Sequence, residues 1–188
     1  MLATLPKNIL VLIDIQKEYV TPGRPFYLSG FEPSLENSRQ LLAFARKNNW
    51  EIIHIQHSNG ETAERFNSKT EYFDFVDDFK PINSEKHFVK MDFSCYSSPE
   101  FNTYMSELFT SKEAAPNIYL IGYNTVMCCL STLEEARRKK HKMHLVKDAT
   151  LAKAIGNVTE KDMHQIMLGV YAAKGLAPLV TTEEIIRQ

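Results

Sequence analysis

The sequence predicts an α/β protein with three layers, α-β-α, in which helices cover both faces of a central, mostly parallel sheet of six strands. Two observations lead to this prediction. Short apolar runs, typical of strands buried on both faces, alternate along the chain with helical patterns. No linker, low-complexity tract or internal repeat interrupts the alternation, so we expect one domain over residues 1–188.

The first half of the chain predicts three strands and two helices. The expected strands are 9–14, 51–56 and 87–90, and the expected helices are 34–48 and 99–110. A long polar and aromatic stretch separates the second strand from the third, with aromatic side chains at Phe66, Tyr72, Phe73, Phe75 and Phe79. A loop with so many aromatics packs locally or closes over a neighbour. We therefore expect residues 58–86 to form either a lid over a site or a subunit interface.

The second half of the chain continues the same alternation. The apolar run 118–121 predicts a buried strand that ends at Gly122. After a polar turn, Cys128 opens a stretch of good helix formers over 130–140. The remaining expected elements are a strand over 143–146, a helix over 159–173, a strand over 176–180 and a short C-terminal helix.

The composition is ordinary for a soluble globular protein, with 44% hydrophobic residues, 24% charged residues and a formal net charge of -1. This balance gives no reason to expect nucleic acid or an anionic membrane as a partner. No apolar run approaches the length of a membrane span, and the segment before the first strand is too short for a secretory signal. Three cysteines, two of them adjacent, do not resemble a disulfide framework, so we expect a reducing, cytoplasmic setting.

Three residues that can carry chemistry follow strands at one edge of the predicted sheet. Asp14 ends the first strand, Lys90 ends the third, and Cys128 follows the fourth. Open sheets of this type bind ligands at the carboxyl ends of their strands. The start of a helix and a nearby lysine both favour the thiolate form of a cysteine. A carboxylate that takes the thiol proton, beside an ammonium that stabilises the thiolate, predicts attack on a carbonyl carbon.

These residues resemble the isochorismatase-like cysteine hydrolases, a family that includes nicotinamidases, N-carbamoylsarcosine amidohydrolases and related amidases. The resemblance extends from Ile9 to about Ile185. The segments that carry it are 10–16 with Asp14 and Tyr19, 88–90 with Phe93 and Ser94 after it, and 122–128 with Thr132 and Ala136 after it. Asp148, His164 and 180–184 also look like family features. We expect a Rossmann-like strand order on this basis.

The resemblance implies that Cys128 is the nucleophile, Asp14 the general base and acid, and Lys90 an electrostatic support. It also implies a cis peptide bond between Tyr123 and Asn124. In that arrangement the backbone N–H groups of Asn124 and Cys128 point at the developing oxyanion. The residues expected to shape the substrate pocket are Gln16, Tyr19, His57, Phe93 and Tyr96. A structural role for His57 is equally compatible with the sequence. Members of the family are usually homodimers or homotetramers, so we expect a homo-oligomer.

The metal site of the nicotinamidases is not reproduced in this sequence. Those relatives bind a metal through an aspartate and histidines near the second strand. Here His57 matches one histidine, but Ile55 stands at the aspartate position, and no histidine lies between His57 and His87. We therefore expect no metal and no cofactor.

The presence of Cys128 favours cleavage of a C–N bond in a small amide or carbamoyl substrate through a thioester acyl-enzyme. Isochorismatases proper often lack the cysteine and cleave a vinyl ether, so that metal-free reaction is one alternative. A catalytically idle homologue that acts as a binding or assembly protein is another, although such a protein does not need all three residues.

The two remaining cysteines are weaker candidates for the nucleophile. Cys129 adjoins Cys128, but one helical step turns a side chain by roughly 100°, so only one of the two faces the site. The spacing from Gly122 and Thr125 favours Cys128. A redox role for the adjacent pair lacks a Cys-x-x-Cys motif. Cys95 is expected to be buried.

Overall fold

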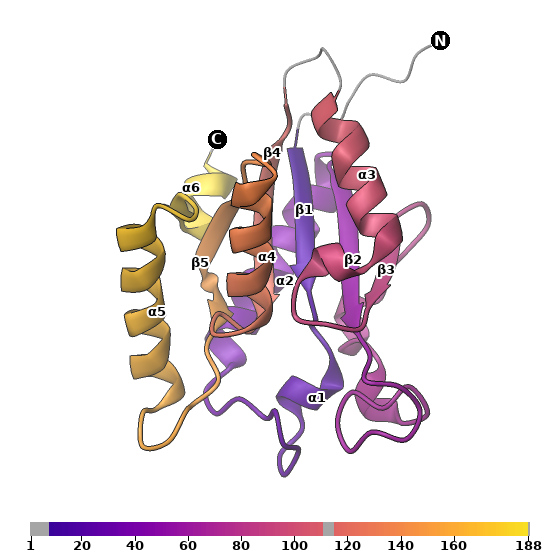
Figure 1. Ribbon diagram of the computed structural model, residues 1–188, viewed down its shortest axis with the longest axis vertical. Coiled ribbons are helices and arrows are strands. Elements are labelled where there is room, and N and C mark those ends of the chain that lie inside the picture. Colours follow the sequence, from indigo (N-terminus) through magenta and orange to yellow (C-terminus); the bar gives the residue numbers. More distant parts are fainter. Residues whose placement is uncertain (1–7, 111–114, 188) are drawn as a thin grey trace.

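The computed structural model describes residues 8–110 and 115–187, which form a parallel sheet between two layers of helices (Figure 1). The strands are β1 (Asn8–Ile13), β2 (Glu51–His57), β3 (Lys86–Lys90), β4 (Asn117–Tyr123), β5 (His144–Leu151) and β6 (Leu179–Val180). Their order is β3-β2-β1-β4-β5-β6, and every neighbouring pair is parallel. The predicted fold class and the Rossmann-like strand order are confirmed. The order reverses direction between β1 and β4, where folds of this kind bind ligands.

The central strands are apolar because both of their faces are covered. Successive side chains of β1 point to opposite faces, so Ile9, Val11 and Ile13 join one buried cluster. Leu10 and Leu12 join a second cluster on the other face. The continuous apolar run that predicted a buried strand thus supplies the cores of both layers.

Three long helices cover the first face of the sheet: α3 (Pro99–Thr110), α4 (Cys128–Arg138) and α5 (Glu160–Lys174). On the other face lie α2 (Glu32–Lys47) and the short α6 (Thr182–Ile186). Figure 1 shows α3 and α4 in front of the sheet, α2 behind it, and α1 (Lys17–Val20) below the end of β1. Within the described residues, no helix combines the length and apolarity needed to cross a membrane.

Several element boundaries differ from the predicted ones for local reasons. The predicted strand 176–180 is shortened to β6 because α5 ends on Gly175, whose positive φ of 56° lets the Leu176 N–H bond back to the Tyr171 carbonyl. β5 continues to Leu151 instead of ending at residue 146, since its pairing with β4 resumes after an irregularity. The four-residue α1 was not predicted.

Gly122 permits a close approach between the ends of β1 and β4. The residue has a φ of 103°, and a Cβ atom at this position would lie 2.1 Å from the Ile13 carbonyl oxygen. Only glycine fits that space and that backbone conformation. Because Asp14 follows Ile13 directly, the contact also fixes the start of the candidate site.

Candidate active site

Asp14, Lys90 and Cys128 meet at the carboxyl edge of the sheet. The Lys90 Nζ atom lies 2.9 Å from Asp14 Oδ2 and 3.4 Å from Cys128 Sγ. Asp14 and Lys90 are fully buried, and Cys128 is only 3% exposed. The structure thus brings together the three residues that the sequence suggested for catalysis.

Each of the three side chains is placed by a regular element. Asp14 follows β1 with a φ of 51°, its N–H donating to the Ile55 carbonyl at 3.0 Å. Lys90 ends β3, where it lies in register with His57 of β2. Cys128 is the first residue of α4. The fold therefore brings two strand ends and one helix start together in one polar cluster.

The Lys90 ammonium is the centre of this cluster. Besides Asp14 and Cys128, it donates to His57 Nδ1 at 3.1 Å and to the Asp92 carbonyl at 3.1 Å. Burial on its own lowers the pKa of Lys90, but the neighbouring acidic groups, the Asp14 carboxylate first among them, raise the pKa by more, so the net shift is upward. Lys90 therefore stays charged while it is buried.

The contact with Lys90 also determines the protonation state of His57. An ammonium can only donate, so His57 Nδ1 must accept and the ring proton must sit on Nε2. Nε2 then donates to Asn59 Oδ1 at 2.9 Å. Burial and the charge of Lys90 lower the pKa of His57. A neutral His57 is thus a fixed acceptor that helps to orient Lys90.

The protonation state of Cys128 differs from the sequence-based expectation. The helix start and the lysine were expected to favour the thiolate. In the structure, burial and the Asp14 carboxylate raise the pKa of the Cys128 thiol, and the Lys90 ammonium offsets only part of that rise. The resting group is therefore a thiol. Its neighbour Asp14 carries a buried oxygen, Oδ1, that accepts no hydrogen bond among the described residues.

The turn before Cys128 has the backbone form that the resemblance implied. The peptide bond between Tyr123 and Asn124 is cis. The Asn124 side chain holds the turn, since its Oδ1 accepts the N–H groups of Val126 and Met127, each at 3.1 Å. Among the described residues, the N–H groups of Asn124 and Cys128 have no acceptor. Two backbone donors are therefore free beside the thiol.

The other two cysteines are buried and make different contacts. Cys129 is fully buried, with its Sγ 3.9 Å from the Gly122 carbonyl oxygen. Cys95 is buried as well, in agreement with expectation, and its N–H donates to Thr132 Oγ1 at 3.0 Å. Cys128, in contrast, lies within hydrogen-bond distance of Lys90 and lines a pocket.

A pocket of about 290 Å³ opens in front of Cys128. Three residues expected to contact substrate line it, namely Tyr19, His57 and Phe93. The lining residues that were not predicted as contacts are Phe26, Asn59, Arg65, Phe66, Met91, Asp92 and Met127. The wall is therefore mainly aromatic and apolar, with a few polar groups, as is typical of small-molecule sites.

Gln16 and Tyr96 were also expected to shape the pocket, but they do not line it. The Gln16 side-chain amide is fully hydrogen-bonded to backbone groups. Its Nε2 donates to the His57 and Phe73 carbonyls at 3.1 and 2.7 Å, and its Oε1 accepts the His57 N–H at 2.9 Å. Tyr96 is buried with its hydroxyl 2.9 Å from His141 Nδ1. Both side chains hold neighbouring segments in place.

The stretch 58–86 divides into two parts with different surroundings. Asn59, Arg65 and Phe66 line the pocket, so the first part covers the site. Phe75 and Phe79, by contrast, are buried against the protein interior. Both the lid and the subunit interface that the sequence suggested stay predictions.

Comparison with known proteins places this arrangement in a family. The family model described as the isochorismatase domain matches residues 8–184. The chain belongs to the isochorismatase family. It is 26% identical over 141 residues to the uncharacterized isochorismatase family protein YddQ of Bacillus subtilis (strain 168), covering 74% of this chain and 75% of YddQ. The family resemblance predicted from the three motifs is confirmed.

Solved structures show the same fold at low sequence identity. An isochorismatase from Pseudomonas putida KT2440 has a TM-score of 0.84 and 23% identity, with 97% of this chain and 93% of that chain covered. A cysteine hydrolase from Pseudomonas syringae pv. phaseolicola 1448A has a TM-score of 0.80 and 18% identity, with 100% and 97% covered. The fold of this isochorismatase-family hydrolase is therefore shared over nearly its whole length.

Proposed function

We propose that the protein hydrolyses a C–N bond of a small amide or carbamoyl compound, with Cys128 as the nucleophile. The observation that carries this proposal is the cluster in which one ammonium, Lys90, contacts the carboxylate of Asp14 and the sulfur of Cys128. A nucleophile beside a base, with a charged group that orients both, is the usual arrangement for covalent catalysis. The pocket in front of the sulfur admits only a small substrate.

Formation of the acyl-enzyme begins with proton transfer from the thiol. Asp14 takes the proton of Cys128, and the thiolate attacks the carbonyl carbon of the amide. The oxyanion that forms accepts hydrogen bonds from the free N–H groups of Asn124 and Cys128. In other acyl-transfer enzymes the loss of one such donor costs about 3 to 4 kcal/mol of transition-state stabilisation. Asp14 then returns its proton to the nitrogen, the C–N bond breaks, and the amine or ammonia leaves.

Hydrolysis of the thioester repeats the same proton transfers with water. Asp14, again a carboxylate, takes a proton from a water molecule, and the resulting hydroxide attacks the thioester carbon. The C–S bond breaks, Cys128 recovers its proton from Asp14, and a carboxylic acid is released. Lys90 keeps its charge throughout, so it holds the carboxylate in place and stabilises the thiolate when that forms.

A raised pKa of the resting thiol fits this order of events. An exposed thiolate would react with many electrophiles, whereas a buried thiol next to a carboxylate is deprotonated as the substrate is attacked. An idle homologue would not require a buried ion pair against the sulfur, since removing two charges from water is costly even when they pair. The same cluster therefore argues against the binding-protein alternative.

The proposal is tested by measuring ammonia or amine release from a panel of small carboxamides, ureido acids and cyclic amides. The wild type should hydrolyse at least one of them. Cys128→Ser should lower kcat/KM by at least about 10³-fold, as expected when a catalytic nucleophile is replaced. Turnover of a vinyl ether substrate alone, or unchanged amide turnover in Cys128→Ser, would refute the amidase assignment.

A further inference from the structure

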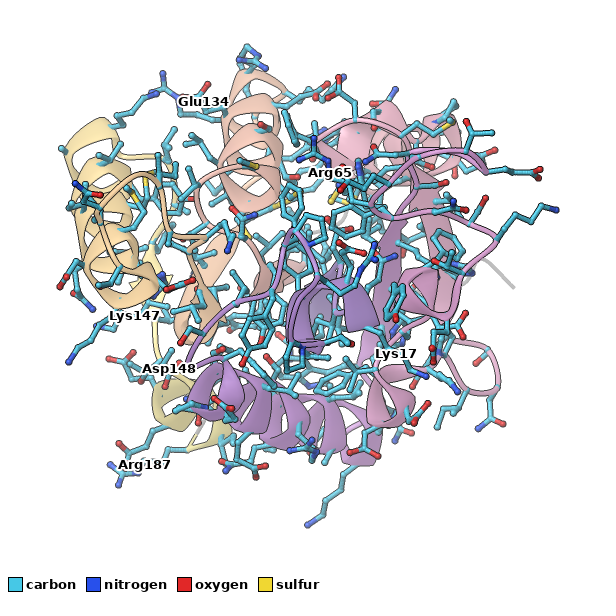
Figure 2. All side chains as sticks on the ribbon, turned by 90° about the horizontal axis from the view of Figure 1, so that it is seen from below. Lys17, Arg65, Glu134, Lys147, Asp148 and Arg187 are labelled. Atoms are coloured by element: carbon cyan, nitrogen blue, oxygen red, sulfur yellow. The ribbon has the colours of Figure 1, made fainter. Side chains whose placement is uncertain are left out.

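Arg65 is a charged residue in the pocket wall that the proposed mechanism does not use. It is exposed and lines the same pocket as Cys128. Figure 2 looks onto the edge where the strands end, and its label marks Arg65 on the segment that follows β2. The guanidinium lies over the ring of Phe26, another lining residue, at 5.4 Å from the ring centre. The aromatic face thus holds a positive charge at the mouth of the pocket.

A comparison with Arg24 shows what is unusual about Arg65. Arg24 also lies over an aromatic ring, that of Tyr72, but its guanidinium bonds to Glu18 Oε2 at 2.9 and 3.1 Å and to the Glu64 carbonyl at 2.6 Å. The Arg65 guanidinium has no ion pair or hydrogen bond with the described residues. Its five N–H donors are therefore available to a ligand.

Hydrogen bonds fix the backbone around Arg65 beside the pocket. On one side, the Glu64 carbonyl accepts from Arg24. On the other side, the Phe66 carbonyl accepts the Asn59 N–H at 3.0 Å, and the Arg65 carbonyl accepts from the Asn59 side chain at 3.3 Å. Because Asn59 Oδ1 also accepts a hydrogen bond from His57 Nε2, the loop is tied to the catalytic cluster.

Asp92 is the negatively charged residue in the pocket lining, and it is not an ion-pair partner of Arg65. Its carbonyl oxygen is the atom turned to the catalytic cluster, since it accepts from Lys90 Nζ. Its carboxylate accepts the neighbouring Phe93 N–H at 2.6 Å and so caps its own turn. Asp14 and Lys90 offset each other, His57 is neutral, and the Asp92 carboxylate is engaged by the Phe93 N–H. Arg65 therefore supplies the cationic donors in the pocket lining that no described residue uses.

We propose that the substrate carries a carboxylate that pairs with Arg65 while its amide carbonyl carbon lies against Cys128. The inference rests on the proposed hydrolase function and narrows its substrate class to small anionic amides. A guanidinium presents two parallel N–H groups that match the two oxygens of a carboxylate. The aromatic and apolar wall around Phe26, Phe66 and Met127 then packs against the short chain that links the two groups.

Binding to a catalytically impaired protein tests this inference apart from turnover. In the Cys128→Ser background, dissociation constants are measured by ligand-observed NMR for three monoanionic amides, malonamate, succinamate and glutaramate, and for the corresponding neutral diamides. The same measurements are made after Arg65→Gln, Arg65→Lys and Arg137→Gln. The last variant removes an equal charge from an exposed site nine residues along α4 from the sulfur, about 13 Å away.

At least one monoanionic amide should bind more tightly than its diamide. Arg65→Gln should weaken that binding by about fivefold or more, while diamide binding and the effect of Arg137→Gln stay within about twofold. Arg65→Lys should retain part of the preference for the anionic amide, because lysine keeps the positive charge but lacks the two parallel N–H groups of the guanidinium. High salt should reduce the preference.

Three results would overturn the inference: equal weakening of both ligand types by Arg65→Gln, no change in either, or no binding of any monoanionic amide at millimolar concentration. Tighter binding of a cationic amide such as β-alaninamide would also overturn it and would assign charge selection to Asp92. None of these results bears on whether Cys128 is the nucleophile, which is decided by the turnover experiment.

Discussion

The catalytic cluster and the pocket wall in front of it are built in opposite ways. In the cluster, Asp14 and Lys90 are fully buried, and each is placed by the end of a β-strand. In the wall, Arg65, Met91 and Phe93 are exposed, and all three lie outside the helices and strands. The Met91 side chain is 70% exposed, whereas Lys90, its neighbour in sequence, is completely covered.

This difference separates the chemistry of the site from its selectivity. A buried ion pair keeps its geometry because any movement leaves a charge without a partner. Exposed loop residues are free to change without such a penalty, and substrate contacts are commonly found on loops held by a rigid scaffold. We therefore expect substitutions in the cluster to affect turnover or folding, and substitutions in the wall to affect which substrate is bound.

The largest effect on turnover is expected for Asp14→Asn, which keeps the shape of the side chain but removes the base. The value of kcat should fall by about 10² to 10⁴-fold, with a smaller change in KM, since general acid–base catalysis is lost. Initial rates on the best amide substrate measure the effect, and circular dichroism verifies that the variant is folded. A folded Asp14→Asn variant with more than a tenth of the wild-type kcat would contradict the role of Asp14.

Stability should respond most strongly to Gly122→Ala, at the contact between the ends of β1 and β4. The added Cβ would meet the Ile13 carbonyl oxygen at 2.1 Å, and the residue already has a φ of 103°. The free energy of unfolding, measured in urea, should fall by at least about 3 kcal/mol. Gly169→Ala is the matched control, because Gly169 lies in α5 with open space around its Cα, and there the change should stabilise by up to about 1 kcal/mol.

A moderate effect is expected for the acceptor of Lys90, His57. Its pKa is lowered by burial and by Lys90, so His57 is neutral near pH 7 and gains a proton only below its usual value of about 6.5. A protonated ring would face Lys90 Nζ at 3.1 Å, so activity should fall as the pH drops below that value. In His57→Gln, whose amide oxygen still accepts, this acid limb should shift or disappear in the pH profile of kcat. An unchanged profile would show that another group causes the loss.

All six histidines carry a lowered pKa because of burial, which has a consequence for folding. The unfolded chain takes up protons at a higher pH than the folded chain does, so stability should decrease as the pH falls from about 7 to 5. Urea titrations at several pH values measure this dependence. A rise in stability towards pH 5 would contradict histidines that stay neutral in the folded protein.

The smallest effect is expected for Cys129→Ala, next to the proposed nucleophile. Cys129 faces the Gly122 carbonyl and the core, so turnover should stay within about threefold of the wild type. Loss of the buried sulfur should reduce stability by about 1 kcal/mol. If Cys129→Ala abolished turnover while Cys128→Ala did not, the two cysteines would have to exchange roles.

The sequence predicted the positions of site residues best where a strand or helix fixes the direction of the chain. Asp14, Lys90 and Cys128 each stand at the end of a strand or the start of a helix, so the parallel sheet alone brings them to one edge. Gln16 comes only two residues after Asp14, yet its amide turns to the β2 backbone, because the positive φ at Asp14 bends the chain there. The identity of a residue close to Asp14 in the sequence does not show in which direction its side chain points.

Most residues of the pocket wall could not be predicted from the sequence. Arg65 and Asn59 lie in an irregular loop, where no period in the pattern tells which side chains face inward. The raised pKa of Cys128 was also missed, because burial and the distance to Asp14 are properties of the folded site. The signal that was present, the concentration of aromatics around Phe66, pointed to a covering segment without assigning contacts.

The most direct test of covalent catalysis is intact-mass spectrometry of the protein quenched in acid during turnover of its best amide substrate, followed by peptide mapping. We predict a mass increase equal to the acyl group minus one hydrogen, located on Cys128 and absent from Cys128→Ala. The Cys129→Ala variant should show the same adduct. An adduct on Cys129, or full turnover by Cys128→Ala without any adduct, would contradict the account.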